Sequence, residues 1–142
     1  MESQLKQAKE RMEAGGHTAV ACREGVFYTA DERGVRPLLA WLDGGVDLSG
    51  GVAADRVVGR AAAFLYVLLG VRAVWAGILS RPAQEVFEQN GIEADCGVLV
   101  DAIRDRAGTG FCPMETAVRD ISDPERALAA VRAAVARLAQ GK

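Results

Sequence analysis

The chain has 142 residues, half of them hydrophobic and a quarter charged, and its net charge is -2. This length suits a single domain spanning residues 1–142 with enough chain to bury a core, and the charge argues against a nucleic-acid-binding protein, whose surface would be basic. Arg72 interrupts the longest apolar stretch, so none reaches the ~20 residues of a membrane span, and the charged N-terminus is unlike a signal peptide. We therefore expect a cytoplasmic protein that binds neither nucleic acid nor membrane.

Apolar periodicity, interrupted by glycine and proline, predicts alternating helices and strands. The expected elements are, in chain order, a helix over 2–14, strands over 17–23 and 26–30, a helix over 37–42, a strand over 51–54, a helix over 57–69, a strand over 72–79, a helix over 82–90, a strand over 92–96, and two helices that begin near Pro113 and Pro124. Glu24-Gly25 separates two β-rich runs and indicates a hairpin, and Asp123 is the expected N-cap of the last helix. The order predicts an α/β fold in which a mixed sheet carries helices on both faces.

Two segments, 55–62 and 79–86, are each expected to run from the end of a strand into a helix. The run Val-Val-Gly-Arg-Ala-Ala over 57–62 resembles the helix start that reads Cys-Ala-Glu-Arg-Ala-Ala in cytidine deaminases. The run Leu-Ser-Arg-Pro-Ala-Gln over 79–84 resembles the strand end and helix start that bear the paired cysteines of those enzymes. The resemblance implies a cytidine deaminase-like fold, a three-layer α/β/α arrangement with a mixed β-sheet.

The same resemblance implies that the zinc chemistry is missing. Zinc deaminases hold a metal ion with three ligands, the ion activates a water, and a glutamate moves its protons. Val57 stands at the first ligand position, Gly59 at that of the glutamate, and Ala83 and Val86 at the two cysteine positions. None of these residues can bind zinc or transfer a proton, so we expect no metal, no cofactor and no deaminase activity.

Further segments resemble a family of small, uncharacterised prokaryotic proteins that forms a zinc-less branch of the deaminase superfamily. They are Arg-Gly-Val-Arg-Pro-Leu-Leu over 33–39, Ala-Asp-Arg-Val-Val-Gly-Arg-Ala-Ala over 54–62 and Cys-Pro-Met-Glu over 112–115. No activity comes with this resemblance. A different metal site built from His17, Cys22, Cys96 and Cys112 stays open as an alternative, although these donors lack paired-ligand spacing.

Two arginines and a glycine lie at the start of the helix expected over 57–69. Arg56 directly precedes this helix, and Gly59 and Arg60 are in its first turn. Two cations four residues apart share a helix face and oppose the positive end of the helix dipole, and glycine is unfavourable inside a helix. Together they indicate an anion at this turn, such as a phosphate held by the arginines and by backbone N–H groups near Val58 and Gly59. The structural alternative is that Asp55 and other carboxylates neutralise the arginines while Gly59 admits a close-packed helix.

Cys112 precedes Pro113 and is expected to be the N-cap of a helix, where Ser, Thr, Asp or Asn is usual. A thiol at a helix start can act as a nucleophile, although a small buried side chain there serves packing equally well. Thr109, in a glycine-rich loop, either contacts a ligand or makes a turn.

Three hypotheses about function follow. The first is a binder of a nucleotide or another phosphate-bearing small molecule; its expected site residues are Asp55, Arg56, Val58, Gly59, Arg60, Thr109 and Glu115. The second is a metal-free enzyme that uses Cys112, Asp55 or Glu115 as nucleophile or base. The third is an assembly protein without a small ligand. A homo-oligomer is compatible with all three, since Trp41 and Trp75 suit either the core or a subunit contact.

Overall fold

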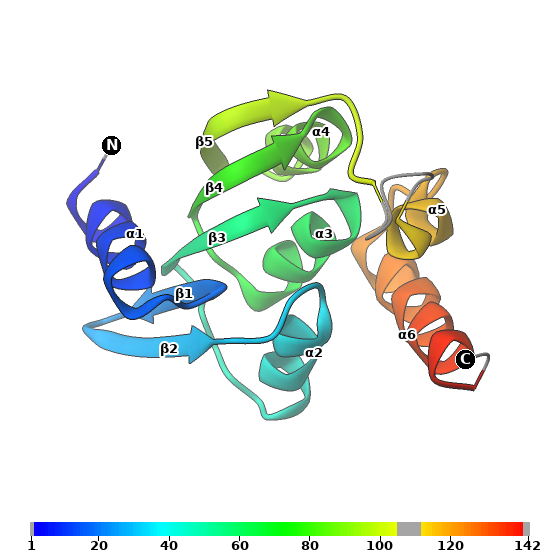
Figure 1. Cartoon of the computed structure of the whole chain (residues 1–142), viewed down its shortest axis with the longest axis horizontal. Coiled ribbons are helices and arrows are strands. Elements are labelled where there is room, and N and C mark those ends of the chain that lie inside the picture. The colour runs from blue at the N-terminus through cyan, green and yellow to red at the C-terminus, as the bar shows by residue number, and fades with distance from the viewer. Residues whose placement is uncertain (1, 105–111, 141–142) are drawn as a thin grey trace.

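The computed structural model describes residues 2–104 and 112–140 (Figure 1). Helices and strands alternate along this part of the chain. They are, in order, α1 (Ser3–Gly15), β1 (Ala19–Arg23), β2 (Val26–Ala30), α2 (Arg36–Asp43), β3 (Val52–Val58), α3 (Arg60–Leu69), β4 (Ala73–Ser80), α4 (Arg81–Gln89), β5 (Glu93–Val100), α5 (Pro113–Val118) and α6 (Pro124–Gln140). Asp123 accepts a hydrogen bond from the N–H of Arg126 at 2.9 Å, which confirms the N-cap expected for the last helix.

The strands form one mixed sheet in the order β2-β1-β3-β4-β5. β1 is antiparallel to β2, because the hairpin expected at Glu24-Gly25 returns the chain beside itself, and β1 is also antiparallel to β3. β3, β4 and β5 are parallel, and each crossover contains a helix. The predicted α/β class, a mixed sheet with helices on both faces, is confirmed.

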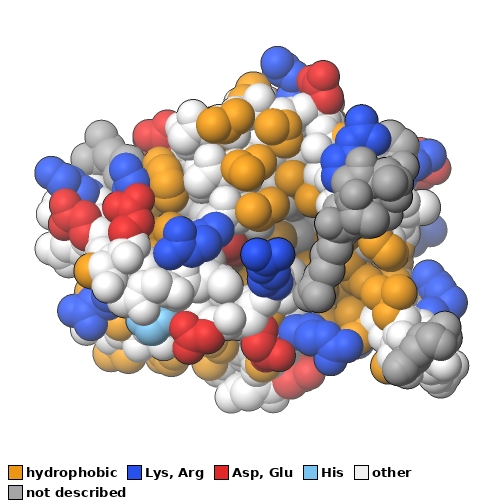
Figure 2. Space-filling model, in the orientation of Figure 1, with side chains coloured by type: hydrophobic (Ala, Val, Ile, Leu, Met, Phe, Trp, Pro, Cys, Tyr) orange, Lys and Arg blue, Asp and Glu red, His pale blue; other side chains and the backbone are white. Residues whose placement is uncertain are grey.

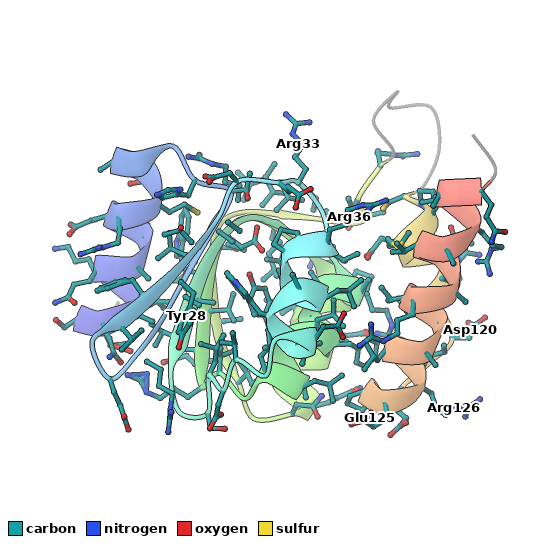
Figure 3. All side chains as sticks on the ribbon, turned by 90° about the horizontal axis from the view of Figure 1, so that it is seen from below. Tyr28, Arg33, Arg36, Asp120, Glu125 and Arg126 are labelled. Atoms are coloured by element: carbon teal, nitrogen blue, oxygen red, sulfur yellow. The ribbon has the colours of Figure 1, made fainter. Side chains whose placement is uncertain are left out.

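The helices make two unequal layers around the sheet. α1 covers one face, where its residues Leu5, Ala8 and Met12 pack with Val20 and Trp75 of the sheet. α2, α3 and α4 cover the other face, and α5 and α6 pack against α3 at the end of the molecule opposite α1 (Figure 3). The main core therefore lies between the sheet and α3.

The start of α3 differs from the sequence-based expectation. Val57 and Val58 are not helical: they extend β3 by pairing with Ile78 and Leu79 of β4. β-branched residues suit a strand, and the parallel ladder overrides the helical pattern of the residues that follow. Gly59 is extended, at φ -100° and ψ -176°, and is the N-cap of α3 rather than a residue inside it.

Side chains of β3, β4 and β5 alternate between the two faces of the sheet, and this alternation shifts by one residue at Arg56, Gly77 and Gly97. These three residues lie on a line across the strands. Before this line Trp75 faces α1, whereas after it Ile78 takes that face and Leu79 joins the core beneath α3. The glycines permit a close approach between strands. A Cβ at Gly77 would lie 2.8 Å from the carbonyl oxygen of Arg56, and one at Gly97 would lie 2.9 Å from that of Gly77. β5 continues past this line to Val100, so the predicted end of this strand at residue 96 is wrong.

Candidate functional site

A cleft of about 440 Å³ opens where β4 and β5 end and α3 begins. It lies beyond the carboxyl ends of the parallel strands, the place where ligands bind in many α/β sheets. Side chains of both charges line it. The lining residues are Arg60, Pro82, Glu85, Ala102, Ile103, Glu115, Thr116 and Arg119.

Glu115, in the first turn of α5, directs its carboxylate at the start of α3. Its Oε1 accepts a hydrogen bond from the N–H of Arg60 at 2.7 Å, and its Oε2 accepts one from the N–H of Ala61 at 3.0 Å. A carboxylate is favourable there because it satisfies two free N–H groups at the positive end of a helix. Burial raises the pKa of Glu115, and the two N–H donors oppose that rise.

Gly59 makes room for this carboxylate. A Cβ at residue 59 would lie 2.5 Å from the carboxyl carbon of Glu115. The anion that the sequence predicts at this turn is thus supplied by the chain itself, and Gly59 admits a side chain of α5, as the structural alternative expects. A phosphate at the same N–H groups would have to displace Glu115.

The Arg60 side chain reaches from α3 to the far end of α5. Its Nε donates to the carbonyl of Val118 at 3.1 Å, and its Nη2 donates to that of Ile121. Nη1 lies 3.8 Å from a carboxylate oxygen of Glu85 in α4. Since 11% of the Arg60 side chain is exposed, this cation joins three helices and presents little surface to a ligand.

Arg56 lies elsewhere. The expectation that it shares a helix face with Arg60 is wrong, because Arg56 belongs to β3. Its Nε donates to the carbonyl of His17 at 2.7 Å, and its Nη2 lies 3.5 Å from that of Met12. Arg56 therefore ties β3 to the end of α1 on the other side of the sheet.

Asp55 and Val58 lie beneath α3 and do not line the cleft. Asp55 is 8% exposed; its Oδ2 accepts the Tyr66 hydroxyl at 2.7 Å, and its Oδ1 accepts the N–H of Val57 at 3.3 Å. Burial raises the pKa of Asp55 to about 7. Burial also raises the pKa of Tyr66, and the charge of Asp55 raises it further. Val58 is fully buried in the core.

Cys112 is the N-cap of α5, as expected, but its side chain makes no capping hydrogen bond to the helix backbone. It is partly buried against the main core, and its N–H donates to the carbonyl of Ile103 at 3.2 Å. Thr109 lies outside the described residues. In residues 2–104 and 112–140, no three His, Cys, Asp or Glu side chains gather so as to hold a metal ion.

The positions that the sequence resemblance equates with zinc ligands do not form a common site. Val57 is 44% exposed and lies on the α1 face of the sheet, whereas Ala83 and Val86 are fully buried on α4. Of the residues that line the cleft, the sequence-based site contains Arg60 and Glu115 and lacks the others, which are Pro82, Glu85, Ala102, Ile103, Thr116 and Arg119. For Arg119 a signal was available, because it lies four residues after Glu115 and side chains four apart share a helix face.

The fold and the cleft define a single-sheet α/β protein with an acidic side chain at its candidate site. Residues 7–135 match the family model described as "TM1506: Domain of unknown function (DUF1893)", and the chain belongs to this family. This confirms the expected membership of an uncharacterised family. None of the described helices has the length and apolar character needed to cross a membrane.

A solved structure of the same family has the same fold. The crystal structure of a DUF1893 family protein (TM1506) from Thermotoga maritima is 21% identical, has a TM-score of 0.84, and is matched over 96% of this chain and 92% of that chain. A diaminohydroxyphosphoribosylaminopyrimidine deaminase/5-amino-6-(5-phosphoribosylamino)uracil reductase from the same organism is 20% identical, has a TM-score of 0.42, and is matched over 66% of this chain and 35% of that chain. No curated protein matches the chain.

Proposed function

We propose that the protein binds a nucleotide or another phosphate-bearing small molecule in the cleft, and that it is an inactive relative of the zinc deaminases. The observation that carries this proposal is the position of Glu115, whose carboxylate lines a cleft of about 440 Å³ and is held there by two backbone N–H groups. That volume lies within the range of about 300–1,000 Å³ common for small-molecule sites.

Glu115 would contact the part of the ligand that carries hydrogen-bond donors. Each of its carboxylate oxygens accepts one backbone N–H and has a second lone pair for another donor. The amino and ring N–H groups of a nucleobase are such donors. Because the acceptor is fixed before the ligand arrives, little side-chain entropy is lost on binding.

Arg119 would contact the phosphate. It lies four residues after Glu115 and also lines the cleft, and a guanidinium can bind a phosphate through two parallel hydrogen bonds. This position replaces the phosphate site expected at the start of α3, where Glu115 already accepts the N–H groups of Arg60 and Ala61. Support for a deaminase ancestry comes from Gly59, since the Glu115 carboxylate lies beside the position that the sequence resemblance equates with the catalytic glutamate.

The test is calorimetric titration of the purified protein with a panel of nucleosides and of their mono- and diphosphates, supported by thermal unfolding. A ligand present at 100 times its Kd should add about 2.7 kcal/mol to the free energy of unfolding. We expect Arg119→Ala to weaken phosphorylated ligands by about tenfold or more and to leave the parent nucleosides unchanged. The control is Glu88→Gln, which removes an exposed carboxylate of α4 that does not line the cleft. The proposal fails if no member of the panel binds, or if Arg119→Ala and Glu88→Gln behave alike.

A metal-free enzyme is the second candidate, and the raised pKa of Glu115 favours it. A carboxyl with a raised pKa is suited to general acid–base catalysis. Of the proposed catalytic residues Cys112, Asp55 and Glu115, the one found in the cleft lining is Glu115. Each ligand that binds is therefore incubated with the protein and followed by NMR. Turnover lost in Glu115→Gln, while Glu88→Gln retains it, would establish catalysis, and unchanged ligand would exclude it for that compound.

A further inference from the structure

The outer edge of β5 has no strand beside it within the described residues 2–104 and 112–140, and Figure 1 shows this strand at the rim of the sheet. The N–H of Glu93 donates to the carbonyl of Arg72, which directly precedes β4. Because the backbone polar groups of a strand point alternately to its two sides, those of the next residue, Ala94, point outward. An open edge with outward N–H and C=O groups is a template for a further strand.

The side chains of β5 alternate irregularly between the two faces of the sheet. Before Gly97, Asp95 shares the open α1 face with its register partner Trp75. After Gly97, it is Val98 that takes this face, where it is 55% exposed and where Figure 2 shows hydrophobic side chains gathered over the sheet. We call this change the pleat shift. The β5 side chains that pack toward the core on the other face are Ala94, Cys96 and Leu99.

The pleat shift restricts which strand fits the open edge. Residues directly opposite each other in an antiparallel pair have their side chains on the same face. A strand with regular alternation therefore matches β5 on one side of Gly97 and mismatches it on the other. A second β5 matches on both sides when a two-fold axis, perpendicular to the sheet, passes between Cys96 and Gly97. The opposite residues are then Ala94 with Leu99, Asp95 with Val98, and Cys96 with Gly97.

The charges of β5 favour the same arrangement. Both acidic residues, Glu93 and Asp95, lie in the first half of the strand and are exposed. The antiparallel pairing sets them opposite Val100 and Val98 of the second copy, so no carboxylate faces another. A parallel pairing in register would set each carboxylate opposite its own copy, and like charges directly opposite are destabilising.

We propose that two copies of the chain pair through β5 as antiparallel strands around this axis, so that their two five-stranded sheets join into one. Side-chain face and polar-group direction alternate together along a strand, so Leu99, on the face of Ala94, also points its polar groups outward. These two residues then exchange backbone hydrogen bonds between the copies. Two-fold contacts of this kind are the commonest in homo-oligomers. The dimer does not depend on the function proposed for the cleft, whose lining contains no residue of β5.

The first test measures molar mass by size exclusion with light scattering across a dilution series, in which the wild-type chain should dimerise. Val98→Lys sets an ammonium opposite Asp95 of the second copy, and Val98→Asp sets a carboxylate there. Because each contact occurs twice, the dimer Kd of Val98→Asp should exceed that of Val98→Lys by about tenfold or more. Adding Asp95→Lys to Val98→Asp should restore the dimer.

The control for net charge is Val26, which is 53% exposed on β2 at the opposite edge of the sheet. Val26→Lys and Val26→Asp should have the same dimer Kd. Circular dichroism verifies that each variant is folded. A wild-type monomer at every concentration overturns the proposal, and so do equal Kd values for the two Val98 variants.

The second test leaves the interface unchanged. Around the proposed axis the two copies of Cys96 lie on the same face, one residue apart along neighbouring strands, so their Cα atoms are about 6–7 Å apart. Cys96 is partly exposed, and a short bismaleimide should link the two copies through it. A crosslinked dimer should appear on a denaturing gel for wild type and for Cys112→Ser, and it should be absent for Cys96→Ser. Crosslinking that depends on Cys112 instead, or no crosslinking at all, would show that β5 is not the interface.

Discussion

Glu115 and Arg60 cap each other's helices. The Glu115 carboxylate accepts the N–H of Arg60 at the start of α3, and the Arg60 guanidinium donates to the carbonyl of Val118 at the end of α5. The anion thus occupies the positive end of one helix dipole and the cation the negative end of the other, which is the favourable arrangement at both ends. This reciprocal contact fixes α5 across the cleft and holds the carboxylate that the proposed ligand would meet.

Removing the carboxylate should destabilise the protein. Glu115→Ala leaves the N–H groups of Arg60 and Ala61 without their acceptor and removes one cap of the reciprocal pair. We expect a loss of about 1–3 kcal/mol in the free energy of unfolding, measured by urea denaturation. Glu85→Ala is the control, because the Glu85 carboxylate is 67% exposed and lies 3.8 Å from Arg60. Its loss should cost less than about 1 kcal/mol. Equal costs for the two variants would contradict the capping role.

Gly59→Ala should lower the free energy of unfolding, and a double-mutant cycle can test whether the contact with Glu115 is the cause. The new Cβ would lie 2.5 Å from the Glu115 carboxyl carbon, so the carboxylate must move away from its N–H donors. We expect a loss of about 1–3 kcal/mol in the wild-type background. In the Glu115→Ala background the loss should shrink by about 1 kcal/mol or more, because the two sites are in contact. Additive losses would show that Gly59 is required for some other reason.

Stability should depend on pH through Asp55. Its pKa is about 7 in the folded protein against an ordinary value of 3.8, so between these two pH values the folded state binds more protons than the unfolded state. The free energy of unfolding therefore falls as pH rises through this window, with a contribution from Asp55 that approaches about 1.4 kcal/mol per pH unit. Glu115 contributes with the same sign because its pKa is also raised.

Asp55→Asn isolates that contribution. Its stability relative to wild type should increase between about pH 5 and pH 8, because the amide does not ionise. The substitution also alters the hydrogen bonds with Tyr66 and Val57, which changes the stability at every pH. The quantity to compare is therefore how the difference in free energy of unfolding between Asp55→Asn and wild type changes with pH. Urea denaturation at several pH values provides the measurement. A difference that stays constant across the window would mean that Asp55 does not titrate there.

Sequence alone predicted the alternation of elements and the class of sheet, because apolar periodicity and helix-ending glycines are local signals. It misplaced the start of α3, since Val57 and Val58 become strand only through pairing with β4. For the same reason it put Arg56 and Arg60 on one helix face. It indicated a ligand anion beside Gly59, whereas the carboxylate found there belongs to Glu115 and arrives through a contact between residues more than fifty positions apart. Such a contact leaves no local pattern.

The pleat shift makes a prediction about the order of two glycine substitutions. Gly77→Ala places a Cβ 2.8 Å from the carbonyl oxygen of Arg56, within a central strand that β3 and β5 hold on both sides. Gly97→Ala places one 2.9 Å from the carbonyl oxygen of Gly77, but on the outer strand, which can move. We expect Gly77→Ala to lower the free energy of unfolding by about 2–3 kcal/mol and Gly97→Ala by about half as much, because overpacking costs less where the backbone can relax. Urea denaturation of both variants measures the difference. Equal or reversed costs would mean that β5 is held as firmly as the centre of the sheet.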